Sequence, residues 1–88
     1  MPVDARQLET ALKERLAPLQ LQVQDDSAAH AGHAGAGEGS HYTVRIVSER
    51  FAGLSRVARH RLVYDALGSL IPQGIHALAI HAKAPGEA

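Results

Sequence analysis

The sequence predicts an α+β fold in which helices cover one face of a three-stranded sheet, within a single domain spanning residues 1–88. The first observation is that apolar residues recur every three or four positions in two segments, as in helices. The second is that they recur every second position in three other segments, as in strands. The third is that 88 residues suffice for only one small core. Packing the helices on one side of the sheet is the simplest two-layer solution.

The first helix is predicted to begin after Asp4, which forms a capping pair with Gln7. Its apolar stripe has one leucine every fourth position: Leu8, Leu12 and Leu16. Pro18 ends the helix, because proline lacks a backbone donor and disfavours helical geometry in the residue before it. The result is an amphipathic helix with one face directed to the core.

Alternation of apolar and polar residues predicts strands over 19–24, 41–48 and 75–82. We expect the first two strands to pair in antiparallel fashion, which is the simplest arrangement. The segment 25–40 between them is rich in glycine and alanine and has no large apolar residue. It therefore predicts a flexible surface loop. The last residues, 83–88, predict a frayed tail.

A second, longer helix is predicted over 54–71, after a turn at 51–53 and before Pro72 and Gly74. Its apolar residues follow helical spacing, and its first half carries a cluster of basic residues. The cluster consists of Arg56, Arg59, His60 and Arg61. The order of elements is α-β-β-α-β, with room for a short extra turn before the long helix.

The composition excludes several classes of function. Nine basic residues balance nine acidic ones, whereas a protein that binds nucleic acid through its overall field usually has a positive excess. The absence of cysteine excludes disulfides, a thiol nucleophile and a cluster held by this chain's own thiolates. No stretch approaches the length of a membrane span and no leader pattern is present, so we expect a cytoplasmic protein with no membrane partner.

The chain has six histidines, which are its most prominent chemical feature: His30, His33, His41, His60, His76 and His81. Imidazole is a borderline metal ligand and titrates near neutral pH. His30 and His33 could form half of a zinc site, but a glycine-rich loop offering two imidazoles lacks the four ligands and ordered surroundings that structural zinc requires. We expect His41 and His81 to be solvent-exposed strand residues.

Several short motifs, in this order and spacing along nearly the whole chain, resemble the BolA family. They are Asp25-Asp26-Ser27, Ser40-His41-Tyr42, Ile46-Val47-Ser48, Phe51-Ala52-Gly53, Arg59-His60-Arg61-Leu62-Val63-Tyr64 and Gly74-Ile75-His76-Ala77-Leu78. The resemblance implies an α-β-β-α-α-β fold similar to the class II KH domain. It also implies a heterodimer with a monothiol glutaredoxin that shares a [2Fe–2S] cluster, for cluster assembly, trafficking or iron and redox sensing.

In that family, one cluster ligand is a histidine at the start of the last strand, which corresponds to His76. A second ligand comes from the loop between the first two strands and corresponds to His30, with His33 as a neighbouring alternative. Two imidazoles on one iron and thiolates on the other form a Rieske-like set. The thiolates would come from the glutaredoxin and from glutathione. We therefore expect no cofactor in the isolated chain, which would be a monomer or weak homodimer.

The basic cluster of the second helix has two functional interpretations. Arg56, Arg59, His60 and Arg61 could contact the partner protein, because guanidinium groups pair well with carboxylates. The alternative is a DNA-binding transcriptional regulator that uses the helix over 54–71. A KH domain clamps nucleotides with a Gly-x-x-Gly loop, and residues 51–55 contain only one glycine.

An enzymatic function is not expected. The residue types of a catalytic triad occur close together in the sequence, at Asp25, Asp26, Ser27 and His30. However, the serine has no glycine elbow and no evident oxyanion donors. Adjacent aspartates at the end of a strand more commonly form turns.

Overall fold

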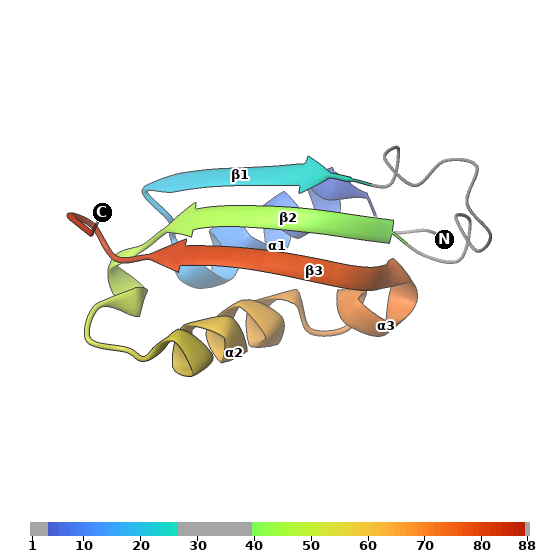
Figure 1. Ribbon diagram of the computed structural model, residues 1–88. Coiled ribbons are helices and arrows are strands. Elements are labelled where there is room, and N and C mark those ends of the chain that lie inside the picture. The colour runs from blue at the N-terminus through green and yellow to red at the C-terminus, as the bar shows by residue number, and fades with distance from the viewer. Residues whose placement is uncertain (1–3, 27–39, 88) are drawn as a thin grey trace.

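The computed structural model describes residues 4–26 and 40–87, apart from the side chains of Ser40 and His76. The elements follow the order α1 (Ala5–Leu16), β1 (Gln20–Asp25), β2 (Ser40–Val47), a 3₁₀ helix η2 (Glu49–Phe51), α2 (Arg56–Leu67), α3 (Leu70–Gly74) and β3 (Ile75–Lys83). This order confirms the predicted α-β-β-α-α-β fold. Figure 1 shows the three strands as one layer, with the helices packed behind and beneath them.

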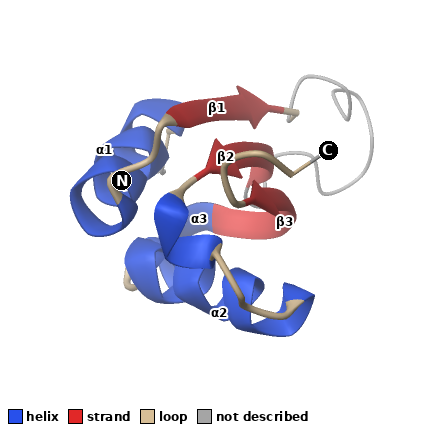
Figure 2. Ribbon diagram, turned by 90° about the vertical axis from the view of Figure 1, so that its left-hand side faces the viewer, coloured by secondary structure: helices blue, strands red, loops and turns tan. Residues whose placement is uncertain are grey.

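The sheet has the order β1-β2-β3, with β2 at its centre. β1 pairs with β2 in antiparallel fashion, as predicted, whereas β2 and β3 run parallel. A parallel pair needs a long crossover connection, which η2, α2 and α3 provide. Figure 2 shows α1 and α2 on one side of the sheet. No helix of the described part covers the other side, which we call the open face.

The core lies between this sheet and the helices. Leu8, Leu12 and Leu16 are buried along one stripe of α1, as the four-residue spacing predicted. The sheet and the crossover supply the other fully buried large side chains: Tyr42, Val44, Ile46, Phe51, Val63 and Leu67. Leu19 differs from the prediction, since it precedes β1 and is 61% exposed instead of packing with the inward residues of that strand.

Helix α1 begins with the predicted capping box. The Asp4 carboxylate accepts a hydrogen bond from the Gln7 backbone N–H, and the Gln7 side chain accepts one from the Asp4 backbone N–H, both at 2.9 Å. At the other end, Ala17 adopts a left-handed conformation with φ of 44°, and Pro18 follows it. The helix therefore ends where proline makes its continuation impossible.

The single helix predicted over 54–71 is wrong in its boundaries. Ser55 caps α2 by accepting a hydrogen bond from the Ala58 N–H, so Leu54 lies outside the helix. Gly68 ends α2 with φ of 48° and ψ of −117°, a combination that glycine adopts more easily than other residues. Pro72 then lies within α3, in the first turn, where its missing N–H would have no helical partner in any case.

The expected boundaries of the loop and of the tail are also wrong. Asp25 belongs to β1 and Ser40 to β2, while residues 27–39 lie outside the described residues. Lys83 is paired with Val47 in the sheet, and Ala84 is buried in the core. Residues 83–87 are thus part of the fold and not a frayed tail.

Ser48 joins the end of the sheet to α1 and provides a test of this packing. Its buried hydroxyl donates to the carbonyl oxygen of Leu16 at 2.7 Å. Leu16 is the last residue of α1, so its carbonyl has no donor within the helix. We expect Ser48→Ala to lower the free energy of unfolding by about 1–3 kcal/mol, measured by urea denaturation, because a buried acceptor loses its partner.

The matched control is Ser69→Ala, since the exposed Ser69 precedes α3 without a side-chain capping bond. Its effect should be within about 0.5 kcal/mol. Equal effects of the two substitutions would show that the Ser48 hydrogen bond contributes nothing specific.

Candidate functional site: one end of the sheet

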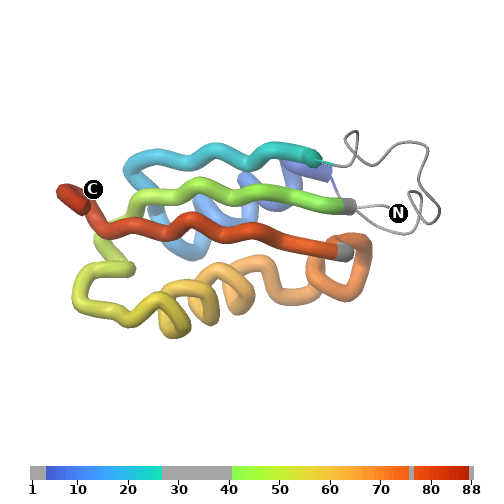
Figure 3. The backbone as a smooth tube through the Cα atoms, in the orientation of Figure 1, coloured from blue at the N-terminus to red at the C-terminus, as the bar shows by residue number. Residues whose placement is uncertain are grey.

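Three strand termini meet at one end of the sheet, which we call the loop end. β1 finishes there, and β2 and β3 begin there, because β1 is antiparallel to β2 while β3 is parallel to it. Asp25 pairs with Tyr42, and Ser40 pairs with Ile75. Figure 3 shows these termini next to one another at the right-hand side of the chain trace.

The backbone of β3 has an irregularity at the loop end, at the predicted ligand His76. Ser40 is paired with Ile75, and the next residue, His41, is paired with Ala77. His76 is therefore the extra residue of a β-bulge. Bulges are common beside functional sites, where they bend the strand locally and change the direction of a side chain. The motif identified His76, but the sequence contains no signal for this bulge.

The other two predicted metal ligands, His30 and His33, lie outside the described residues. Their segment leaves the sheet after Asp26 and returns at Ser40, and both of these residues are at the loop end. In the described ranges 4–26 and 40–87, no three side chains of histidine, cysteine, aspartate or glutamate come together as a metal site.

A shallow hollow of about 260 Å³ lies at the loop end, and Asp26, His41, Thr43, Ala77 and Ala79 are among the residues that line it. Both carboxylate oxygens of Asp26 accept hydrogen bonds within the sheet, Oδ1 from Gln24 at 2.8 Å and Oδ2 from Thr43. The Asp26 N–H also donates to the His41 carbonyl at 2.7 Å. Asp26 therefore extends the β1–β2 pairing beyond the strand end. His41, expected to be a solvent-exposed strand residue, is only partly exposed beside this hollow.

The predicted partner-binding residues of α2 do not form a single group. Arg59 is directed within the molecule: its Nε donates to the Leu54 carbonyl at 3.0 Å and one Nη donates to the Ala82 carbonyl at 3.2 Å. Both Nη atoms also bind the two carboxylate oxygens of Glu87. Arg56 and Arg61 are exposed, and His60 is partly exposed. Arg59 thus connects α2 to the end of β3, which the sequence did not reveal.

The Arg59–Glu87 pair makes a prediction about pH. The hydrogen bond from Arg59, together with one from the Ala84 N–H, lowers the pKa of Glu87 from 4.5 to about 2. Because this pKa is lower in the folded chain, the stabilisation is complete above pH 4.5 and is lost as the pH falls towards 2. We expect Glu87→Gln to lose less stability over this range than the unmodified chain, as measured by urea denaturation at several pH values. Identical pH profiles would contradict this role of Glu87.

Comparison with known proteins identifies the family. The model of the BolA-like protein family matches residues 12–87. This chain belongs to the BolA family. The BolA domain of SufE1 from Arabidopsis thaliana has the same fold, with a TM-score of 0.84 and 43% identity over 100% of this chain and 99% of that domain.

Two curated relatives of this chain have different names and lengths. The SufE-like protein 1, chloroplastic/mitochondrial, of Arabidopsis thaliana is 48% identical over 86% of this chain, which spans only 22% of that protein's length. The DNA-binding transcriptional regulator BolA of Vibrio cholerae is 46% identical over 84% of this chain and 68% of its own. The second name describes a regulator and not an enzyme. Within the described segments, no helix has the length and apolar character needed to cross a membrane.

Proposed function

We propose that this BolA protein is a non-enzymatic adaptor that binds a monothiol glutaredoxin and shares a [2Fe–2S] cluster with it. The role would be the assembly or trafficking of such clusters, or iron and redox sensing. The observation that carries the proposal is the loop end of the sheet. There the bulge at His76 lies beside the two points, Asp26 and Ser40, between which the segment with His30 and His33 is attached.

Chain length supports this ligand set. His30 is four residues from Asp26, and four residues span at most about 14 Å. His33 is seven residues from both Asp26 and Ser40, so it has a longer reach from either side. His76, with His30 or His33 as the second ligand, would hold one iron of the cluster.

The donor set of the chain fits a shared cluster and does not fit one held by this chain alone. The chain has six histidines and no cysteine, whereas [2Fe–2S] centres require thiolates on at least one iron. Imidazole ligands would raise the reduction potential of the cluster relative to an all-thiolate centre. The partner's cysteine and glutathione would supply the sulfur ligands, so the protein would act only in the complex.

A spectroscopic titration tests the proposal. A monothiol glutaredoxin loaded with glutathione and a [2Fe–2S] cluster is titrated with this protein, and the visible absorption and circular dichroism are recorded. Replacement of sulfur ligands by nitrogen ligands should change both spectra until one equivalent of this protein has been added. Unchanged spectra at excess protein would overturn the proposal.

The alternative function is a DNA-binding regulator, which the name of the Vibrio cholerae relative favours. The exposed Arg56 and Arg61 of α2 would then contact phosphates. Gly68-Ser69 between α2 and α3, followed by Leu70-Ile71 at the start of α3, also lacks the second glycine of a KH clamp. Duplex DNA binding that weakens steeply with salt and upon Arg61→Gln, but not upon His76→Ala, would support the regulator. Arg61 is a better probe than Arg59, whose removal also breaks the contact with Glu87.

The cellular compartment stays a prediction. The name of the Arabidopsis relative assigns that protein to chloroplasts and mitochondria. We propose that the complex with glutaredoxin forms in the cytoplasm. Fractionation of cells that express the tagged protein would test this assignment.

A further inference from the structure

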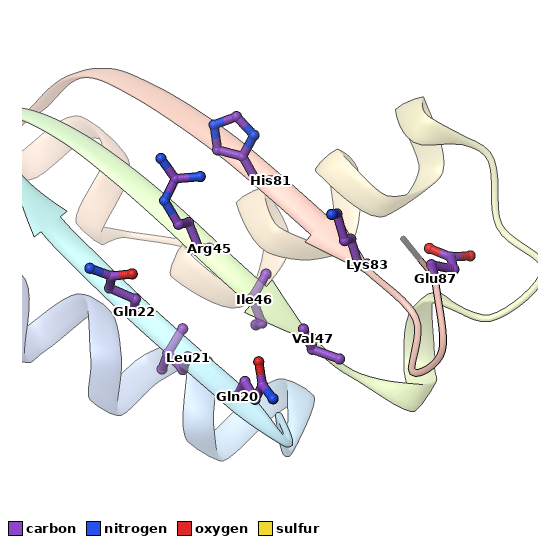
Figure 4. Close-up of a pocket in the computed structure, with 9 residues that line it drawn as sticks. All are labelled: Gln20, Leu21, Gln22, Arg45, Ile46, Val47, His81, Lys83 and Glu87. Carbon is purple, nitrogen blue, oxygen red and sulfur yellow. The ribbon is translucent and has the colours of Figure 1, made fainter.

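The open face of the sheet carries a group of basic side chains far from the loop end, which we call the open-face cluster. It consists of Arg45 on β2 and of His81 and Lys83 on β3, and all three side chains are exposed. They line a shallow hollow of about 500 Å³ together with Gln20 and Gln22 of β1. Figure 4 shows Arg45, His81 and Lys83 projecting from the same face of the sheet.

The pairing of the strands fixes the spacing of this cluster. Arg45 is the direct register partner of His81 on β3 and of Gln22 on β1. Neighbouring strands are about 4.8 Å apart, and residues two positions apart along a strand are about 6.6 Å apart. The three basic groups therefore originate from a patch of about 5 by 7 Å.

The described acids balance the charges of this patch only in part. In the described part of the chain, the side chains of Arg45 and His81 have no hydrogen bond or ion pair. Glu87 also lines the hollow and interacts with Lys83, but both of its carboxylate oxygens are bound to Arg59. The positive charges of Arg45 and Lys83 therefore share this face with a carboxylate that Arg59 already binds.

From this arrangement we propose that the open-face cluster binds a compact anion with one or two phosphate groups, such as a diphosphate. The guanidinium of Arg45 would form paired hydrogen bonds to phosphate oxygens, and Lys83 would act as a point charge. The imidazole of His81 and the amides of Gln20 and Gln22 would donate the remaining hydrogen bonds. This site is separate from the loop end and does not depend on the proposed exchange of a cluster.

The shape and composition of the face favour a compact anion over a nucleic acid strand. Proteins that bind single strands combine basic residues with aromatic side chains on which the bases stack. All three aromatic residues of the chain lie elsewhere, since Tyr42 and Phe51 are buried and Tyr64 is on α2. A patch of about 5 by 7 Å is also too short to follow an extended polyanion.

The experiment is a titration of the ¹⁵N-labelled full chain with sodium pyrophosphate at constant ionic strength, followed by amide chemical shifts. We expect saturable shifts confined to the amides around Arg45, His81 and Lys83. Arg45→Gln should weaken binding about tenfold, since it removes a charge-assisted pair of hydrogen bonds. Lys83→Gln provides a second test at an exposed position, should Arg45→Gln not fold.

The matched control is Arg6→Gln, which removes the same charge from the exposed first turn of α1 and should leave binding unchanged. Three results would overturn the proposal. One is non-saturable shifts spread over all basic residues, and another is equal weakening by Arg6→Gln and Arg45→Gln. The third is binding of a single-stranded oligonucleotide to this face without binding of pyrophosphate.

Discussion

His76→Ala is expected to abolish the spectral change that the protein produces in a cluster-loaded monothiol glutaredoxin. Position 76 is the extra residue of the β-bulge at the start of β3, beside the attachment points of the segment with His30 and His33. Alanine removes the imidazole and offers no donor to iron. When one of the two ligands from this protein is lost, the visible absorption and circular dichroism spectra should be the same as those of the glutaredoxin alone.

A conservative variant separates ligation from folding. His76→Cys replaces the imidazole by a thiolate, which also binds iron, so it should restore a spectral change, with a band pattern closer to that of an all-thiolate cluster. Far-UV circular dichroism of both variants would establish that the sheet is intact. If His76→Ala produced the full spectral change of the unmodified protein, His76 would not be a ligand.

His30 and His33 can be distinguished in the same assay. His30→Ala and His33→Ala each remove one imidazole from a segment that lies outside the described residues. Only the variant that lacks the working ligand should reduce the spectral change strongly. If neither did, the second donor would have to come from outside this segment, or either histidine could replace the other, which the double variant would decide.

The largest effect on stability is expected for Phe51→Ala. Phe51 is 0% exposed and lies in η2, at the start of the crossover that leads from β2 to α2. Truncation of a buried phenylalanine to alanine costs about 3–5 kcal/mol, because apolar contacts are lost and a cavity remains. Domains typically have a total stability of only about 5–15 kcal/mol, and a chain of 88 residues belongs at the lower end.

The measurement is thermal unfolding followed by far-UV circular dichroism. A loss of this size should lower the Tm by at least about 12 °C, or leave the variant unfolded at ambient temperature. Tyr64→Ala is the control, since it truncates an aromatic residue of α2 that is 43% exposed. A Tm of Phe51→Ala no lower than that of Tyr64→Ala would show that η2 is not anchored through Phe51.

Local sequence patterns predicted most of the elements, because periodicity and capping act over a few residues. The four-residue spacing of Leu8, Leu12 and Leu16 and the Asp4–Gln7 capping box both appear in α1 as predicted. The pattern failed where tertiary contacts decided. Val57 follows the helical spacing of apolar residues in α2, yet it is 64% exposed, because it lies on the side of α2 that faces solvent.

The candidate site was only partly predictable. The BolA-like motifs indicated His76 and His30 as ligands, with His33 as a neighbouring alternative, whereas the basic cluster of the second helix indicated Arg59 as a partner-facing residue. The structure gives Arg59 an internal partner, Glu87, which is 28 residues away in sequence. No local pattern reports a contact over such a distance, since it depends on where the crossover returns the chain to the sheet.

The sequence by itself determined the family, the α+β class and the absence of thiolates, because motifs, periodicity and composition depend only on the order of residues. Only the tertiary structure decided that β3 runs parallel to β2, that one residue bulges at His76, and that Arg45 lies opposite His81. These features arise from the register between β2 and β3, whose paired residues are 35 or 36 positions apart in the chain. Side-chain packing and hydrogen bonding of the whole domain determine this register together.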